Sequence, residues 1–405
     1  MTRTCRLTVL GVALATLVPK LILASRTFGT EDVLTWTKFA HGVAVAGPVG
    51  VYSIDFHHVA GTIYNHPPLM GYCLAAANQL ARAGIPLGFT IRSVSSIADV
   101  FSALLVFEMV RRRWSLRKET AAGILVGISP VLLLVSGYHG NTEPLFVMLA
   151  LLGAYLLVDR DAPLFAGIAL ALALAVSVKV VPVVMLPALG VYALRHRRDL
   201  LARVAAGFGA TFVVLWAWPV LSQRWAVVHH VIGYSGVADR QWGIVQLLSW
   251  THNQQLVALS VSPGKTIVVA ICALGPAALV WQRGDQAVEA ACWSLTSFLL
   301  LSPAFGVQYL AWAAAPAFLL DVGVATAYNV LAGLFLLQVY NRWSGGFPWH
   351  AMARGRPFTS GEVAFGLVVW ATLILLTVIS ALRFRLLLGR PASEATPLRR
   401  LRFAR

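Results

Sequence analysis

Charged side chains are scarce in this sequence: they make up 12% of its 405 residues, and the whole chain holds 16 acidic residues. Soluble domains carry about 25% charged residues, so this composition excludes an ordinary water-soluble fold. Cysteine is also rare, and its four residues lie in or beside apolar runs without the spacing of metal ligands. The chain contains no Gly-x-x-x-x-Gly-Lys loop, so no nucleotide site is indicated.

Long hydrophobic runs fill most of the chain instead. Runs of roughly 17–25 apolar residues are long enough to cross a bilayer as helices. We therefore expect an all-α integral membrane protein, a bundle of about 10–13 transmembrane helices. The expected spans are 7–24, 91–110, 120–136, 143–159, 163–178, 180–194, 202–221, 265–282, 286–302, 308–322, 324–340 and 361–382. No internal repeat is recognised, which counts against transporter folds built from two similar halves.

The basic residues predict the orientation of these spans. Of the 32 basic residues, 20 lie in short segments on one side, including the tail 383–405. By the positive-inside rule this side is cytoplasmic and holds both termini, in a plasma-membrane protein. The three longest connections, 25–90, 222–264 and 341–360, then face outside. A basic chain can also bind nucleic acid, but no basic-aromatic module supports that partner.

Two adjacent acids, Glu31 and Asp32, open the first long connection directly after the first span. A carboxylate at the membrane surface can act as the general base that accepts a proton from an attacking hydroxyl. The alternative is helix capping, in which Thr30 or Asp32 begins a helix lying in the membrane interface. A second interfacial helix is expected over 68–83, between a Pro-Pro pair and Gly84.

Hydrogen-bonding side chains gather at three outer turns, where they can bind a sugar or a phosphate. Solvated turn chemistry and an aromatic belt are the alternatives. These binding candidates are Asn65, His66, Tyr138, His139, Asn141, Gln308 and Tyr309. His66 also stands near Asp55, His57 and His58, but their spacing does not favour a metal site, and we expect no metal ion and no cofactor.

Three cations are candidates for holding a phosphate. Lys179 and Arg92 lie within or at the ends of apolar spans, where ionisable side chains are costly. Asp99 follows Arg92 by two turns on the same helix face, and Arg240 lies in the second long connection. A cation can neutralise a phosphate leaving group, whereas a lysine that merely extends to the interface is the alternative.

Together these residues resemble the GT-C superfamily of integral-membrane glycosyltransferases. The segment Tyr64-Asn-His-Pro-Pro-Leu69 looks like the loop entry of that superfamily, and the stretch from Ile91 to Asp99 resembles a second-span segment of lipid-linked-oligosaccharide glucosyltransferases. The run from Lys179 to Pro187 is similar to the Lys-x-x-Pro-x-x-x-x-Pro pattern of those enzymes and of polyprenyl-phosphate-mannose-dependent mannosyltransferases. The acid pair departs from the spaced Asp-x-Asp of some members.

The resemblance implies a function for the candidates. A polyprenyl-phosphate sugar would donate a hexose, mannose being preferred, to a glycan, lipid or protein acceptor outside the cytoplasm, with membrane lipids around the enzyme. Asp32 is favoured over Glu31 as the single base, because it stands directly before Val-Leu-Thr-Trp. Lys179, Arg240 and His139 would hold the phosphate, and the transfer would invert the anomeric carbon. A transporter or flippase of lipid-linked sugars is the alternative.

Overall fold

The computed structural model describes residues 2–56, 63–113, 116–233 and 242–388, and every regular element in these ranges is helical. In chain order the elements are α1 (Thr2–Arg26), α2 (Glu31–Gly50), η1 (Val51–Ser53), α4 (Pro68–Arg82), α5 (Leu87–Arg111), α6 (Leu116–Gly127), α7 (Pro130–Leu134), η2 (Val135–His139), α8 (Glu143–Ala154), η3 (Tyr155–Asp159), α9 (Pro163–Val176), η4 (Val178–Met185), α10 (Leu186–Val191), η5 (Tyr192–His196), α11 (Arg198–Ser222), α12 (Arg224–Ala226), η6 (Val227–Ile232), α13 (Gly243–Trp250), α14 (Gln254–Val261), α15 (Pro263–Gln282), η7 (Gly284–Gln286), α16 (Ala287–Leu301), η8 (Val307–Leu310), α17 (Ala311–Ala314), η9 (Pro316–Leu319), α18 (Val322–Ser344) and α19 (Ser360–Leu388).

The expected all-α membrane fold is confirmed. Among the described residues, seven segments are long and apolar enough to cross a bilayer, by length and composition: Thr2–Arg26, Leu87–Arg111, Lys118–His139, Arg198–Ser222, Pro263–Gln282, Val322–Ser344 and Ser360–Phe384. Three shorter apolar helical stretches lie between them: Pro163–Val176, Val180–His196 and Val307–Leu319. The expected spans over 143–159 and 286–302 correspond to α8 with η3 and to α16, which are also short.

Several expected spans are broken helices, and proline explains one of the breaks. Between α9 and α10 the chain forms the 3-10 helix η4, which contains Pro182. A proline has no backbone N–H and clashes with the preceding turn, so an α-helix does not run through it undisturbed. Val180, two residues earlier, has a φ of 55°, a conformation that is strained for a β-branched residue.

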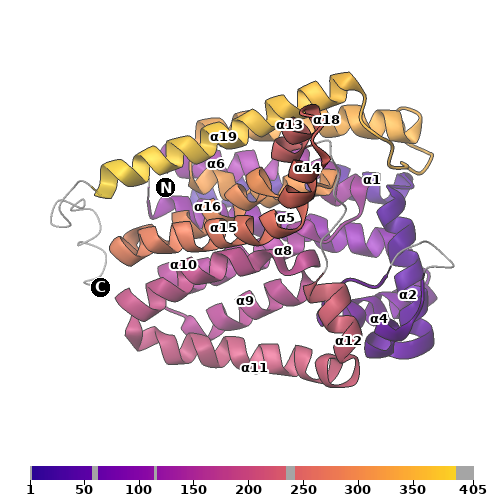
Figure 1. Cartoon of the computed structure of the whole chain (residues 1–405), viewed down its shortest axis with the longest axis horizontal. Helices are drawn as coiled ribbons and strands as arrows, with labels where there is room; N and C mark the ends of the chain where they lie inside the picture. Colours follow the sequence, from indigo (N-terminus) through magenta and orange to yellow (C-terminus); the bar gives the residue numbers. More distant parts are fainter. Residues whose placement is uncertain (1, 57–62, 114–115, 234–241, 389–405) are drawn as a thin grey trace.

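The long helices run side by side, and at one end of the molecule the helices have a different arrangement (Figure 1). The start of α1 and the end of α19 lie at the left of that view, whereas α2 and α4 stand at the right. The helix expected over 68–83 is present as α4, with Pro68 in its first turn, where proline is favoured. Helix α2 kinks at Gly47, whose φ is 79°, and α4 packs closely against the kink.

Glycines let α9 and α11 approach each other closely. A Cβ atom at Gly207 of α11 would lie 2.1 Å from the carbonyl oxygen of Leu164, and one at Gly167 would lie 2.1 Å from that of Val204. Small residues that bring backbones together are a common means of helix association in membranes, where lipid tails compete for apolar surface.

This contact gives a stability prediction. We expect Gly207→Ala to destabilise the protein by about 1–3 kcal/mol, the usual effect of overpacking a tight interface. The measurement is the unfolding midpoint of the detergent-solubilised protein. The matched control is Gly209→Ala on the same helix, where an added Cβ meets nothing within 4 Å. Equal midpoints for the two variants would contradict the prediction.

Candidate active site

Asp32 lies in the first turn of α2, at the end of the molecule that α2 and α4 form. Its Oδ2 atom accepts two hydrogen bonds, from Nε2 of His139 at 3.0 Å and from Nδ2 of Asn141 at 2.7 Å. The side chain is 35% exposed, whereas the His139 side chain is 4% exposed. The structure therefore brings together three residues selected from the sequence and leaves the carboxylate accessible from one side.

Backbone contacts place the turn that carries His139 and Asn141. Thr30, which caps α2 through its hydroxyl group, also donates that hydroxyl to the carbonyl oxygen of His139 at 2.9 Å. The capping interpretation is therefore correct for Thr30. Trp36, one turn after Asp32, donates its indole N–H to the carbonyl oxygen of Gly140 at 3.0 Å. Gly140 has a φ of 88°, which glycine adopts without strain.

A hydrogen-bond chain continues behind the acid. The second ring nitrogen of His139, Nδ1, lies 2.7 Å from the hydroxyl oxygen of Tyr340 in α18. An ionised carboxylate can only accept hydrogen bonds, so Nε2 of His139 carries the proton in the bond to Asp32. In the neutral ring Nδ1 then accepts from the Tyr340 hydroxyl, and the chain fixes both the tautomer and the ring orientation.

The surroundings of Asp32 favour its ionised form. Burial raises the pKa of this carboxyl group, but the electrostatic effect of His139 and the hydrogen bonds from His139 and Asn141 lower it by more. The resulting pKa lies below the ordinary value of 3.8. Asp32 is therefore a carboxylate at neutral pH, able to accept a proton from a hydroxyl group.

His66 contacts the same cluster from the loop before α4. Its ring packs on Trp36 with a centroid distance of 4.2 Å, and its buried Nδ1 atom has no hydrogen-bond partner among the described residues. Burial lowers the pKa of His66 to about 3, although the nearby Asp32 raises it. At neutral pH this imidazole is uncharged. Asn65, the preceding candidate, is half-buried.

The lowered pKa of His66 predicts a pH-dependent stability. Below pH 6.5, the ordinary pKa of histidine, the unfolded chain binds a proton at His66 that the folded protein does not bind until about pH 3. Stability that is fully present above pH 6.5 is therefore lost as the pH falls toward 3. Denaturation midpoints in detergent should decrease over this window, and His66→Phe should flatten the decrease. The exposed His41 of α2 provides the control: His41→Phe should keep the wild-type slope, and equal slopes in all three proteins would refute the prediction.

Glu31 has a different position from Asp32. The loop 345–359, which we call the docked loop, runs along the start of α2 and forms a parallel bridge between Ala353 and Thr30. The backbone N–H of Glu31 donates to the carbonyl oxygen of Ala353 at 3.1 Å. The Glu31 carboxylate accepts from the backbone N–H of Gly355 at 3.3 Å. Glu31 thus contacts the docked loop, whereas Asp32 contacts residues 136–144, which we call the polar turn and which carry His139 and Asn141.

Tyr138 belongs to the polar turn, and Arg92 lies beside it. The ring of Tyr138 packs between Tyr340 and Trp349 of the docked loop, with centroid distances of 5.0 Å and 4.6 Å. The guanidinium of Arg92 donates to the carbonyl and hydroxyl oxygens of Thr27 at 3.2–3.3 Å. These bonds hold the segment that leads from α1 to the acid pair. Asp99, on the same face of α5 two turns later, forms an ion pair with Lys20.

Gln308 and Tyr309 lie on η8. The residues directly after η8 contact the C-terminal end of the polar turn. Tyr309 stacks on Trp312 with a centroid distance of 4.4 Å. The indole N–H of Trp312 donates to Oε2 of Glu143 at 2.6 Å, and Glu143 begins α8 two residues after Asn141. This contact joins the outer turn that contains Gln308 and Tyr309 to the polar turn, whose residues bind Asp32.

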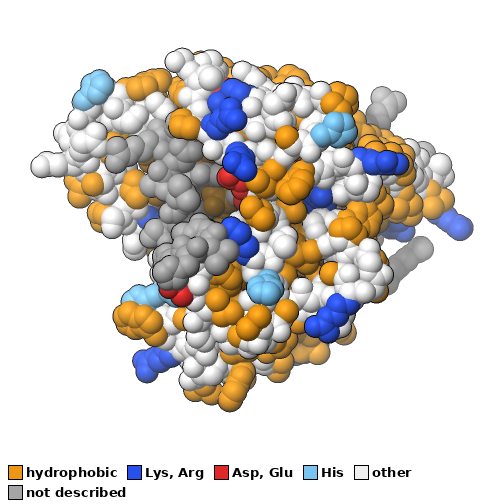
Figure 2. All heavy atoms as spheres, turned by 90° about the vertical axis from the view of Figure 1, so that its right-hand side faces the viewer, with side chains coloured by type: hydrophobic (Ala, Val, Ile, Leu, Met, Phe, Trp, Pro, Cys, Tyr) orange, Lys and Arg blue, Asp and Glu red, His pale blue; other side chains and the backbone are white. Residues whose placement is uncertain are grey.

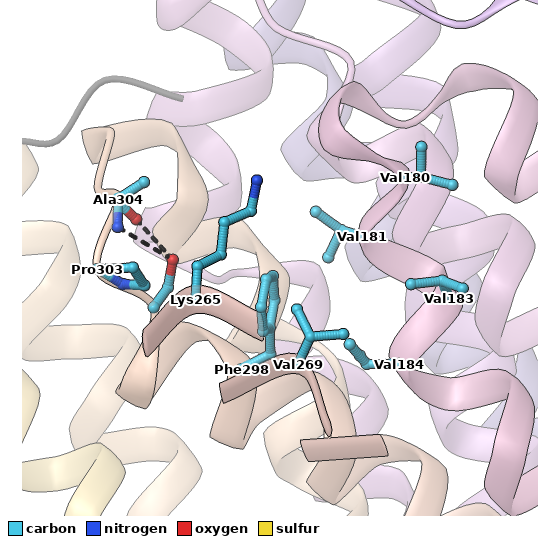
Figure 3. A pocket seen from close by; sticks show the side chains of 10 residues that line it. Val180, Val181, Val183, Val184, Lys265, Val269, Phe298, Pro303 and Ala304 are labelled. Atoms are coloured by element: carbon cyan, nitrogen blue, oxygen red, sulfur yellow. Dashed lines mark hydrogen bonds between the residues drawn. The ribbon is translucent and has the colours of Figure 1, made fainter. Parts of the chain in front are cut away.

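The remaining candidates are the two cations Lys179 and Arg240. Arg240 lies outside the described residues, and for Lys179 the structure describes the backbone, within η4. Next to Lys179, a small apolar pocket opens between η4, α15 and the turn after α16. Its lining includes Val181, Phe298 and Lys265, and Figure 3 shows Lys265 rising between Val181 and Ala304.

The surface view agrees with this arrangement. Figure 2 shows the end of the molecule that carries α2 and α4, where acidic atoms reach the surface beside Lys and Arg atoms, next to a hollow in which hydrophobic atoms are visible. Within the described part of the chain, no group of three His, Cys, Asp or Glu residues could hold a metal ion. Of the histidines considered for a metal site, His57 and His58 lie outside that part.

Sequence reasoning missed three contributors to this cluster. Tyr340 and Trp36 contact the residues around Asp32, and the docked loop lies along its helix. Trp36 had a signal, because it follows Asp32 by four residues and so lies on the same face of the expected helix. Tyr340 had none, because it closes an ordinary apolar run.

The comparison with known families gives a match over part of the chain. Residues 65–223 match one family model, and this segment contains His66 and the whole polar turn. The multi-span helical fold agrees with this match, because the matched model describes a family of GT-C membrane glycosyltransferases. The model is that of dolichyl-phosphate-mannose-protein mannosyltransferase, and the matched residues, about two fifths of the chain, are similar to this family. No curated protein matches the chain significantly.

Proposed function

We propose that this protein transfers a hexose, mannose being preferred, from a polyprenyl-phosphate sugar to an acceptor hydroxyl, with Asp32 as the general base. The family match supports a polyprenyl-phosphate-mannose donor. The observation that carries the mechanism is the environment of Asp32. One carboxylate oxygen accepts from His139 and Asn141, and Oδ1 has no partner among the described residues. The accessible oxygen is available to an incoming hydroxyl group.

The proposed reaction is a single displacement. The acceptor hydroxyl donates its hydrogen bond to Asp32, and its oxygen attacks the anomeric carbon as Asp32 takes the proton. The bond from that carbon to the phosphate oxygen breaks, and the polyprenyl phosphate leaves with the bonding electrons. His139 and Asn141 hold the carboxylate in place throughout. Because attack and departure occur on opposite faces, the configuration at the anomeric carbon inverts.

The apolar pocket supports the donor assignment. Its valines and Phe298 can cover an isoprenoid chain, and Lys265 adds a cation at the edge of the pocket (Figure 3). A cation near the phosphate favours the departing group because it gains negative charge. We assign the phosphate to Lys265 together with Lys179 and Arg240.

The orientation of the protein is part of the proposal. The start of α1 and the end of α19 lie at one end of the molecule, and Asp32 at the other (Figure 1). The basic residues assign the first end to the cytoplasm. The acceptor is then a glycan, a lipid or a protein outside the cytoplasm.

Sugar transfer in membranes tests the proposal. Membranes that contain the protein receive synthetic polyprenyl phosphates carrying radiolabelled mannose, glucose or arabinose, and labelled product is extracted into lipid, polysaccharide and protein fractions. Transfer from the mannose donor is expected. If no donor gives product, while labelled lipid crosses protein-containing vesicles faster than empty ones, the protein moves lipid-linked sugars and the proposal is wrong.

A further inference from the structure

A buried ion pair lies between two membrane-spanning helices. Lys20 of α1 and Asp99 of α5 are 2.7 Å apart, measured from Nζ to Oδ2, and both side chains are 2% exposed. Charged side chains are costly in the interior of a bilayer protein and are retained mainly where they serve a function. A buried ion pair is weak evidence for stability alone, because desolvation of the two charges offsets their attraction.

The pair lies directly against η2, the π-helical turn that ends at His139. Gly137, in the middle of η2, rests on the backbone of Lys20: a Cβ at this glycine would lie 3.0 Å from Cα of Lys20 and 3.2 Å from its carbonyl oxygen. Both α1 and α5 pack against η2. The turn that carries His139 is therefore packed against both helices that the ion pair joins.

Helix α5 contacts the polar turn at a second point. Ser95 precedes Asp99 by one helical turn on the same face, and its hydroxyl group donates to the carbonyl oxygen of Asn141 at 2.6 Å. The α5 face therefore supports both residues that bind Asp32. Ser95 holds the turn at Asn141, and Asp99 binds the lysine on which η2 rests.

We propose that Lys20 and Asp99 are positioning residues. Their ion pair fixes α1 against α5 and so determines the position of η2, from which His139 reaches Asp32. The proposal rests on the proposed role of Asp32 as base. If η2 is displaced, the hydrogen bond from Nε2 of His139 to Oδ2 of Asp32 lengthens and the carboxylate rotates. Misplacement of a catalytic group by about 1 Å can cost about 100-fold in rate.

Two variants separate positioning from folding. Gly137→Ala keeps both charges, but its Cβ must push η2 away from α1. Lys20→Met combined with Asp99→Leu removes both charges without leaving one of them unpaired, so the protein should still fold. The control is Gly209→Ala, a change in a spanning helix where the new Cβ meets nothing within 4 Å. Each protein is assayed in nanodiscs with a short-chain polyprenyl-phosphate mannose, and the ring nitrogens of His139 are observed by ¹⁵N NMR.

We expect both variants to lower kcat by about 10- to 100-fold, to leave KM for the donor within about twofold, and to shift the His139 ring signals. Gly209→Ala should match the wild type in all three measurements. A wild-type kcat and wild-type His139 signals in the variant that combines Lys20→Met with Asp99→Leu would overturn the proposal, as would losses explained by the amount of folded protein. If the wild type transfers no sugar, the proposed function fails, and the His139 signals alone decide whether the pair positions η2.

Discussion

Replacement of Asp32 by asparagine should lower kcat for sugar transfer by about 1000-fold, within the range of about 10²–10⁴ that general bases contribute. Asparagine keeps the size of the side chain and one acceptor oxygen, so the hydrogen bonds from His139 and Asn141 can persist. What it loses is the capacity to take a proton. The measurement is single-turnover transfer by purified protein with donor in excess.

Glu31→Gln is the matched control for this prediction. It makes the same chemical change at the neighbouring acid, whose carboxylate accepts from the backbone N–H of Gly355 and contacts the docked loop. A glutamine oxygen can accept that bond equally well, so we expect less than about a tenfold change. If Glu31→Gln abolishes transfer and Asp32→Asn does not, the base has been assigned to the wrong residue.

The second large effect is expected at His139. His139→Phe keeps a flat ring but removes both ring nitrogens, so Asp32 loses one of its two donors and the buried hydroxyl of Tyr340 loses its partner. We expect kcat to fall by about 100-fold, because the carboxylate is no longer held in a single orientation. The KM for the donor should change little if the main function of His139 is to orient the base.

Glutamine tests the same position more gently. The amide N–H of His139→Gln can donate to Asp32, although it cannot also accept from Tyr340. The expected kcat lies between those of the wild type and the phenylalanine variant. A large rise in the donor KM at constant kcat, in either variant, would instead show that His139 binds the phosphate or the sugar.

The membrane fold was predictable because the bilayer imposes a simple demand. A spanning segment needs about 20 apolar residues, and that pattern is visible without knowledge of tertiary contacts. The interruptions within the helices were harder to predict from the sequence. Pro182 marks a break in the sequence, but the π-turn η2 has no such signal, because it depends on the contact of Gly137 with the backbone of Lys20.

Some residues of the candidate site could likewise be predicted from the sequence, and others could not. The acid pair and the polar turn could be predicted because polar residues are scarce in the rest of the chain and are concentrated at these positions. Their partners were not predictable from local pattern. Tyr340 lies 201 positions from His139 in sequence, and Lys20 lies 79 positions from Asp99. A single tyrosine or lysine in an apolar run carries no periodicity that reveals its partner, so only the folded chain shows these contacts.

The most direct test of the account is the stereochemistry of the product. Purified protein in nanodiscs receives a synthetic polyprenyl-phosphate mannose of known anomeric configuration and a soluble acceptor, and NMR of the product gives the configuration of the new bond. A single displacement with Asp32 as base predicts complete inversion, and no product with Asp32→Asn. Retention of configuration, or full transfer by Asp32→Asn, would contradict the mechanism.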